Sequence, residues 1–210
     1  MADSGFSRNV FVNCPFDTEY ESILQAVLFT LVRFGLTPRI ATERSDAGET
    51  RIDKIQELIV SSKYSIHDLS RCQARTVGEH YRLNMPFELG LDFGCRNYGG
   101  EQFSEKKILV LEEQQYRYQV AISDLAGCDI EAHAGNYAVA MRKVRNWLVG
   151  QGDFETVGAA RVLSEYEDFQ EWHLERQIAA GFSEDDILDF STAELLTAMK
   201  RWVAEGKPRD

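Results

Sequence analysis

Short apolar runs alternate with helical patterns along the first two thirds of the chain, and this alternation limits the fold more than any other feature. Four runs have the composition and length of buried strands: 10–14 (VFVNC), 36–41 (LTPRIA), 64–69 (YSIHDL) and 107–111 (KILVL). Helical patterns separate them at 19–34, 50–61 and 84–96. Strands that alternate with helices in this way pair in parallel through right-handed crossovers. We therefore predict an α/β fold, a three-layer sandwich around a parallel sheet.

Local signals refine this flavodoxin-like arrangement. Gly35 stands where a glycine ends a helix, and Pro38 suits an edge strand better than a central one. A weaker pattern at 119–123 is a candidate fifth strand, and 137–149 (YAVAMRKVRNWLV) is a closing helix. We expect the α/β domain to occupy residues 1–150.

The remaining residues, 151–210, form a predicted helical extension that carries most of the negative charge. The formal charge of the chain is −11, and the extension holds 14 acidic against 6 basic side chains. Helical segments are expected at about 155–180 and 192–204, the second opened by a capping box of Ser191 and Glu194. Five apolar side chains of the extension should dock on the first domain or on a second copy: Val162, Tyr166, Phe169, Trp172 and Leu174. Because this surface needs to be covered, we also predict a homo-oligomer.

Composition excludes several classes of protein. Lys and Arg do not cluster, so direct binding to duplex nucleic acid is disfavoured. The four cysteines lack metal-ligand spacing and read as reduced thiols, which predicts no metal site and a cytoplasmic location. We find neither a signal segment nor an apolar run of about 18 residues, so no membrane association is expected. Phosphate loops of the GxGxxG or GxxxxGK[ST] form are also missing from the sequence.

Ligands of open parallel sheets bind beyond the carboxyl ends of the strands. This rule selects side chains after the first three strands: Asn13, Pro15, Phe16, Asp17, Thr42, Glu43, Asp68, Ser70 and Arg71. Some of these have simpler explanations. Asp68 can cap the next turn together with Ser70, and Arg71 can hold a phosphate or be solvated. His67 lies within a strand and reads as core or interface, whereas His80 and His133 lie in loops.

The segment NMPFELGLDFG, residues 84–94, places a polar stripe on an otherwise apolar helix. Asn84, Glu88 and Asp92 recur at a spacing of four, and we expect the stripe to face a crevice. Phe16, Pro86 and Phe87 would then desolvate Glu88, and a carboxyl in apolar company has a raised pKa. The alternatives are that Glu88 and Asp92 are surface residues and that Asn84 caps the helix.

The motifs VFVNCPF, IHDLSR and NMPFELG resemble the nucleoside 2-deoxyribosyltransferase family and the related TIR-like nucleotide-cleaving domains over residues 9–130. The resemblance implies that Pro15 and Phe16 hold the nucleoside, that Asp68 grips the base, and that Glu88 attacks the anomeric carbon. The chain departs from the family in Asn13 and Cys14 before the Pro-Phe pair and in a longer connection at 72–83. The identity of the substrate stays open.

These observations predict an enzyme that cleaves the N-glycosidic bond of NAD or a related nucleotide, with no required cofactor. The resemblance further implies a role in prokaryotic antiviral defence, with a partner protein of such a system. A neutral purine needs a proton in order to leave, and Asp68 and Asp92 are the candidate proton donors. Charged nicotinamide needs no proton donor. The alternatives are base exchange between nucleosides and a nucleotide-sensing or assembly module without turnover.

Overall fold

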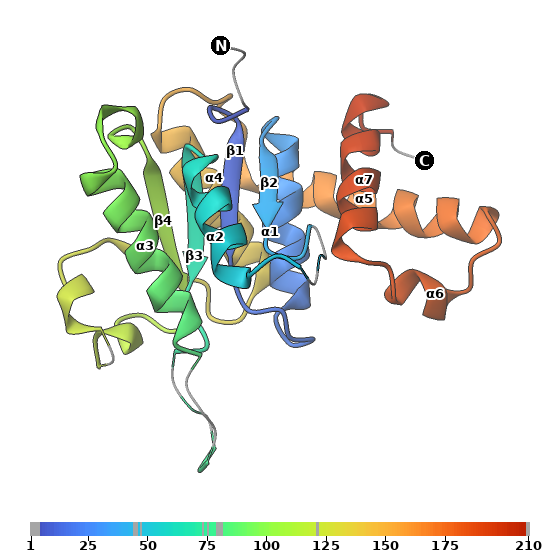
Figure 1. The fold of residues 1–210 in the computed structure, drawn as a ribbon. Coiled ribbons are helices and arrows are strands. Elements are labelled where there is room, and N and C mark those ends of the chain that lie inside the picture. The colour runs from blue at the N-terminus through green and yellow to red at the C-terminus, as the bar shows by residue number, and fades with distance from the viewer. Residues whose placement is uncertain are drawn as a thin grey trace.

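The computed structural model describes residues 5–43, 46, 48–72, 74, 76–78, 82–120 and 122–208 of the chain. Five strands form one parallel sheet in the order β2–β1–β3–β4–β5 (Figure 1). The strands are β1 (Asn9–Asn13), β2 (Thr37–Ile40), β3 (Tyr64–Asp68), β4 (Lys107–Glu112) and β5 (Ile130–Ala132). The predicted α/β fold with a parallel sheet is confirmed.

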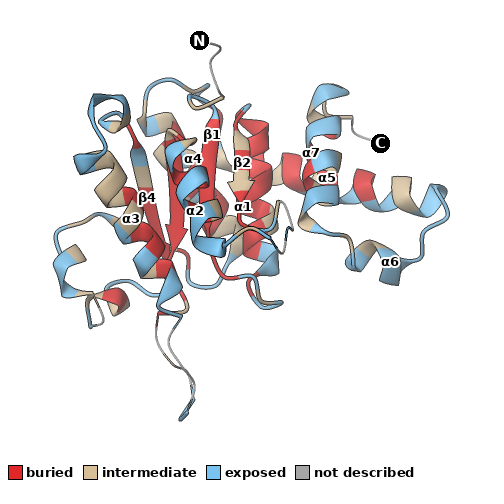
Figure 2. Ribbon diagram, viewed as in Figure 1, coloured by how far each residue is buried: buried red, intermediate tan, exposed pale blue. Residues whose placement is uncertain are grey.

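Helices cover both faces of this sheet and make three layers. The helices α1 (Glu21–Arg33) and α4 (Tyr137–Gly150) share one hydrophobic core with the side chains of Val10 and Val12. On the other face, Phe11 packs with α2 (Arg51–Val60), next to α3 (Asn84–Tyr98). Because successive side chains of a strand point to opposite faces, the run VFV of β1 supplies both cores. Figure 2 shows the central strands buried throughout.

The local signals explain where several elements begin and end. Gly35 adopts φ +72°, a conformation that glycine tolerates, and the chain turns there from α1 into β2. Pro38 lies in β2, which is an edge strand as predicted. Thr50 caps α2 by accepting a hydrogen bond from the backbone N–H of Asp53.

The predicted fifth strand at 119–123 is wrong. Two 3₁₀ turns, Arg117–Val120 and Ser123–Leu125, occupy this stretch, of which residue 121 lies outside the described residues. The fifth strand is the three-residue β5, which pairs with the end of β4. Its residues are all half-buried, so it lacks the alternating or fully apolar pattern that marks a longer strand.

The extension folds as α5 (Ala159–Ala179), α6 (Glu184–Leu188) and α7 (Thr192–Ala204). It docks on α1, where the ring of Phe29 lies 5.1 Å from Tyr166, 5.5 Å from Phe169 and 5.6 Å from Trp202 between centroids. The buried Arg33 of α1 forms an ion pair with the buried Glu165 of α5. These aromatic side chains are therefore covered within one chain, whereas the homo-oligomer and the division at residue 150 stay predictions.

The helix ends of the extension follow their sequence signals. Ser191 and Glu194 form the predicted capping box of α7, and Ser183 with Asp186 forms a second one at α6. Figure 2 shows α6 as exposed, in contrast to the buried face that α5 and α7 turn toward α1. Within the described part of the chain, no helix combines the length and the apolar composition that a membrane span requires.

Candidate functional site

The carboxyl ends of β1 and β3 meet at the point where the strand order reverses. The chain runs from β1 outward to β2 and then returns to β3 on the other side of β1, and Asn13 pairs in register with His67. Such a switch point is where open parallel sheets bind ligands. Some of the residues selected from the sequence line a cleft at this point, and others form a buried polar layer behind the cleft.

The cleft has a volume of about 610 Å³ and is formed by three segments. The loop after β1, the first residue of α2 and the start of α3 with the two residues before it supply its walls: Cys14, Pro15, Phe16, Arg51, Arg82, Leu83, Asn84 and Met85. Three of the predicted binding residues, Pro15, Phe16 and Asn84, thus line it. Asn84 does not cap α3, since Leu83 precedes the helix and makes no side-chain cap, so that alternative is wrong.

Glu88 lies one helical turn beyond Asn84 and is only 4% exposed. Its Oε1 accepts a hydrogen bond from Nη2 of Arg51 at 3.3 Å, and Arg51 itself lines the cleft. Burial raises the pKa of Glu88 above its usual range, although the positive charge of Arg51 opposes this shift. The alternative in which Glu88 is a solvated surface residue is wrong. Phe87 is 58% exposed and does not enclose the carboxylate.

Behind the cleft, a fully buried chain of polar side chains links the sheet to α3. The amide of Asn13 lies 3.0 Å from Nδ1 of His67 and donates to the carbonyl of Met85 at 3.1 Å. Nε2 of His67 lies 3.0 Å from Oδ2 of Asp92, and Nζ of Lys106 lies 3.2 Å from Oδ1 of the same carboxylate. Since the Asn13 amide donates, His67 accepts at Nδ1 and donates from Nε2, which is a neutral tautomer.

Asp92 is therefore a buried anion and not the surface residue considered above. Burial alone would raise the pKa of Asp92, but the hydrogen bond from His67 and the charge of Lys106 outweigh it and hold the pKa below its usual range. The stripe of α3 consequently turns inward at Asp92, toward the sheet, while Asn84 at its other end is exposed. The expectation that the whole stripe faces a crevice is wrong, because the stripe spans both environments.

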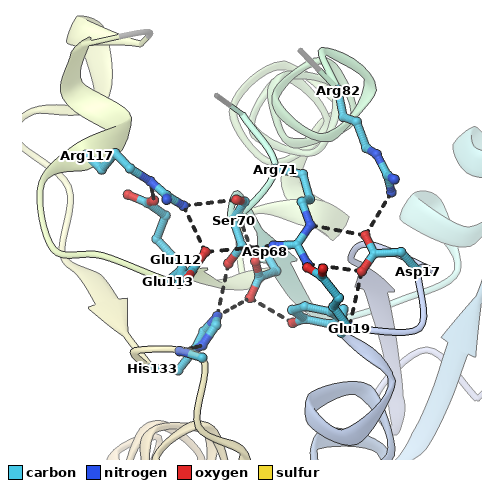
Figure 3. Close-up of polar contacts among 12 residues, drawn as sticks. Asp17, Glu19, Asp68, Ser70, Arg71, Arg82, Glu112, Glu113, Arg117 and His133 are labelled. Carbon is cyan, nitrogen blue, oxygen red and sulfur yellow. Dashed lines mark hydrogen bonds and ion pairs between the residues drawn. The ribbon is translucent and has the colours of Figure 1, made fainter. Parts of the chain in front are cut away.

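Asp68 forms a second buried cluster at the end of β3 (Figure 3). Its Oδ2 accepts from the hydroxyl of Tyr20 at 2.7 Å and lies 3.0 Å from Nε2 of His133, and its Oδ1 accepts from the backbone N–H of Ser70 at 2.8 Å. Burial raises the pKa of Asp68, yet these hydrogen bonds, led by His133, outweigh it and hold the pKa below its usual range. Asp68 is thus a stable carboxylate that caps the turn at Ser70.

The three side chains Ser70, His133 and Asp68 do not form a catalytic triad. A triad requires the serine and the aspartate on opposite ring nitrogens of the histidine. Here Nε2 of His133 faces both the Ser70 hydroxyl, at 3.0 Å, and Asp68. Nδ1 of His133 accepts from the backbone N–H of Gly135 at 3.1 Å. The imidazole is therefore a neutral donor that orders Asp68, with no free base nitrogen for Ser70.

Arg71 is engaged by carboxylates at the rim of the site. Its guanidinium makes two hydrogen bonds to Asp17, at 3.0 and 3.1 Å, and lies near Glu19 and Glu113 (Figure 3). Asp17 also pairs with Arg82 at 3.2 Å. Arg71 precedes the 72–83 connection and Arg82 lies near its end, so Asp17 joins both ends of the connection to the loop after β1. The alternative of a solvated, unpaired Arg71 is wrong.

Sequence reasoning missed five residues of this region: Tyr20, Arg51, Arg82, Lys106 and His133. Arg51 had a usable signal, because the first residue of the helix after β2 lies at the same edge of the sheet as the strand ends. His133 directly follows β5, so the same rule would have selected it had that three-residue strand been predicted. In the described ranges, no group of three or more His, Cys, Asp or Glu side chains is arranged to hold a metal ion.

Comparisons of the chain with family models, with curated proteins and with solved structures find no match. The function therefore has to follow from the side chains themselves. They define a cleft at a topological switch point, with Arg51 and Arg82 on its walls and the buried carboxylate of Glu88 hydrogen-bonded to Arg51.

Proposed function

We propose that the chain binds a nucleotide in the cleft beside Glu88 and cleaves its N-glycosidic bond, with NAD or a related pyridine nucleotide as the substrate class. One observation carries the proposal: a carboxylate that is 4% exposed, with a raised pKa, is hydrogen-bonded to an arginine of the cleft wall. Carboxyl groups perturbed by burial at the edge of a cleft concentrate at functional sites.

Glu88 would act on the positive charge that develops at the sugar. As the bond from C1′ to the base nitrogen breaks, its electron pair leaves with the base and the sugar becomes an oxocarbenium-like cation. A carboxylate in a poorly solvated site stabilises such a cation or captures it covalently. Water then adds to C1′ and releases a proton, which completes hydrolysis.

The surrounding acids favour a leaving group that needs no proton. Asp68 and Asp92 both have pKa values below their usual range and accept hydrogen bonds from buried donors. They are therefore poorly suited to protonate a purine, the role considered for them from the sequence. Nicotinamide of NAD is cationic while bound to the ribose and leaves as a neutral base, so it requires no general acid.

The cleft walls suit a phosphorylated substrate. Arg51 and Arg82 are each about half exposed, with 53% and 49% of the side chain accessible, and among the described residues Arg51 pairs with Glu88 and Arg82 with Asp17. A guanidinium binds phosphate through paired N–H donors. Phosphate at this position would compete with Glu88 for Arg51, and the departure of the arginine would free the carboxylate toward the sugar.

Binding without turnover is the second candidate function, and one observation favours it. In the described structure Glu88 forms an ion pair with Arg51. A nucleotide that only replaces Glu88 as the partner of Arg51 would be bound without being cleaved, as in a sensing module. Base exchange between nucleosides is less well supported, because the cleft walls carry arginines that a free nucleoside does not use.

Mass-resolved turnover tests the proposal. A mixture of NAD, NADP, ATP, GTP and deoxynucleosides is incubated with the wild type, with Glu88→Gln and with the matched control Glu171→Gln, which removes an exposed carboxylate of α5. We expect free nicotinamide from the wild type and from the control, and none from Glu88→Gln. Release of base by Glu88→Gln would refute the catalytic role, and binding without release by the wild type would favour the sensing module.

A further inference from the structure

A second hollow lies within the helical extension, between α5, α7 and the segment that joins them. Its volume is about 420 Å³, within the roughly 300–1,000 Å³ of small-molecule sites. The side chains that matter below are Trp172, His173, Arg176, Phe182, Phe190 and Arg201. None of the residues that line it lines the cleft beside Glu88.

His173 stands out on the wall of this hollow. The residue is 5% exposed, and neither ring nitrogen has a hydrogen-bond partner among the described residues. The imidazole stacks on Phe169 at 5.7 Å between centroids and meets Phe190 edge-on at 5.7 Å. Leaving a buried polar group unpaired destabilises the folded state, so native structures rarely keep one without a reason.

The ring of His173 presents both kinds of hydrogen-bonding group. Burial lowers the pKa of His173, which keeps the imidazole neutral at neutral pH. A neutral imidazole has one N–H donor and one acceptor nitrogen. The edge of a heteroaromatic base offers the complementary groups, whereas a purely apolar ligand would leave both nitrogens unpaired.

Two arginines supply positive charge at the rim. Within the part of the chain that the structure describes, Arg176 and Arg201 both pair with Glu205, at 3.8 Å and 2.7 Å respectively. The other carboxylate that lines the hollow, Glu194, accepts hydrogen bonds from the backbone N–H and the hydroxyl of Ser191 as part of the helix cap. Glu205 and Glu194 together balance the two guanidinium groups, so the feature that suits an anionic group such as phosphate is the paired N–H donors of Arg176 and Arg201.

Aromatic side chains provide surfaces for a planar ring. Arg176 lies over the ring of Trp172 at 5.2 Å, and Phe182 meets Phe190 edge-on at 5.4 Å. Phe182 is 45% exposed although it belongs to this aromatic group. A ring that stacks on Phe182 or Phe190 would cover apolar surface that the chain leaves in water.

We propose that the hollow between α5 and α7 is a second ligand site, which binds a small anionic ligand with a heteroaromatic ring, such as a nucleoside monophosphate. The ring packs on Phe182 and Phe190, and the anionic group lies at Arg176 and Arg201. Both nitrogens of His173 are buried in the free chain, so the imidazole turns into the hollow to pair with the ring. The site goes beyond the proposed function, because it uses none of the side chains of the cleft.

Nuclear magnetic resonance of labelled histidine imidazoles tests this site directly. The full chain carries Glu88→Gln so that no probe is consumed, and it is titrated with AMP, with adenosine and with inorganic phosphate. We expect a saturable shift of the His173 signal with AMP, and at least tenfold weaker binding of adenosine and of phosphate. An unmoved His173 signal would overturn the site, and phosphate that binds as tightly as AMP would overturn the role of the ring.

Substitutions separate this site from the cleft. Arg201→Ala should weaken AMP binding at least tenfold, whereas the control Lys200→Ala, an exposed neighbour outside the hollow, should not. AMP binding that Arg51→Ala removes and Arg201→Ala leaves intact belongs to the cleft, and would overturn the second site. If no base is released in the turnover experiment while the His173 signal still responds to AMP, the proposed function alone fails.

His173→Leu gives a readout that a structural role would not. Removing an unpaired buried group should raise the thermal midpoint of the free chain, because the unsatisfied nitrogens disappear. The same change should weaken AMP binding at least tenfold. A more stable variant with unchanged affinity would show that His173 is only a poorly satisfied core residue, and would overturn its part in the site.

Discussion

Arg51 Nη2 lies 3.3 Å from Glu88 Oε1, and this contact joins the first turn of α2 to the second turn of α3. The two partners differ in exposure, since the arginine side chain is 53% accessible and that of the glutamate 5%. An anion from solvent can therefore reach the arginine without entering the core. The ionisation of Glu88 consequently depends on what occupies the cleft.

Replacing Glu88 by Gln should stabilise the protein at neutral pH. The pKa of Glu88 is raised by burial, so its charged form is disfavoured in the folded state, and the penalty applies at pH values above the folded pKa. We expect a gain of about 1 kcal/mol in the free energy of unfolding at pH 7.5. The gain should vanish as the pH falls below the unfolded value of about 4.3, where both states are protonated.

Urea unfolding at pH 7.5 and at pH 4 measures this difference. Glu171→Gln, which changes an exposed carboxylate of α5, is the control and should stay within about 0.5 kcal/mol of the wild type at both pH values. A loss of stability in Glu88→Gln at pH 7.5 would mean that the ion pair with Arg51 outweighs the burial of the carboxylate.

Removing the charge of Arg51 should raise the pKa of Glu88 further. Arg51 opposes the shift caused by burial, both through its charge and through its hydrogen bond. The proposed catalysis needs ionised Glu88. As the pH is lowered, the activity of Arg51→Met should therefore begin to fall at a higher pH than the activity of the wild type. The pH profile of nicotinamide release measures this, with Arg96→Met, on the last turn of α3, as the control. If the activity falls at the same pH in Arg51→Met and in the wild type, Arg51 does not control the ionisation of Glu88.

Lys106 and Asp92 should behave as a coupled buried pair. Lys106 also donates to the carbonyls of Ile59 and Ser62, so Lys106→Met leaves the two carbonyls without their donor and the buried carboxylate of Asp92 without its positively charged partner. We expect a loss of about 3–5 kcal/mol in the free energy of unfolding. The double variant Lys106→Met/Asp92→Asn should lose less than the sum of the single variants, by about 1–3 kcal/mol. Strict additivity in denaturant unfolding would contradict the pairing.

Asp68 should support stability at neutral pH and lose that role in acid. Its pKa is lowered in the folded state, so its contribution is present above the unfolded value of about 3.9 and is lost as the pH falls through the folded value. Asp68→Asn replaces an acceptor of three hydrogen bonds and should cost about 2–4 kcal/mol at pH 7. The gap between variant and wild type should narrow below about pH 4. Tyr20→Phe, which removes one of the three donors, should cost only about 1 kcal/mol.

Most of the sheet could be predicted from the sequence because its central strands, β1 and β3, are buried on both faces. VFVNC and KILVL are continuous apolar runs, and such runs between helical patterns leave few alternatives to parallel pairing. Gly35 and Ser191 marked helix ends because their signals are local. β5 could not be predicted, since a three-residue strand at the edge of β4 owes its existence to pairing and not to its own composition.

The site could be predicted only in part, because burial of charge depends on partners that are distant in sequence. Glu88 and Asp92 share one stripe of α3, and no local pattern distinguishes the residue at the cleft from the one beneath it. Asp92 can be buried because it forms an ion pair with Lys106, which follows the C-terminal end of α3. Asp68 is likewise fixed by Tyr20 and His133, which lie 48 and 65 residues away. Strand-end topology selects the region, whereas these contacts decide the roles.

Phe29 should make the extension and the α/β layers unfold together. Its ring contacts Tyr166, Phe169 and Trp202 and is fully buried in the core that α1 shares with α4. Phe29→Ala should cost about 3–5 kcal/mol, since it removes a large buried ring from the contact between α1 and the extension. Because the core is continuous, fluorescence and far-ultraviolet circular dichroism should report one common denaturation midpoint in the wild type. The control Phe182→Ala, in a half-exposed ring of the extension, should cost less than about 1 kcal/mol. The contrary result would be two separate unfolding transitions in the wild type, with Phe29→Ala shifting only the midpoint of the less stable one. That result would show that the extension folds as an independent unit and would favour the division at residue 150.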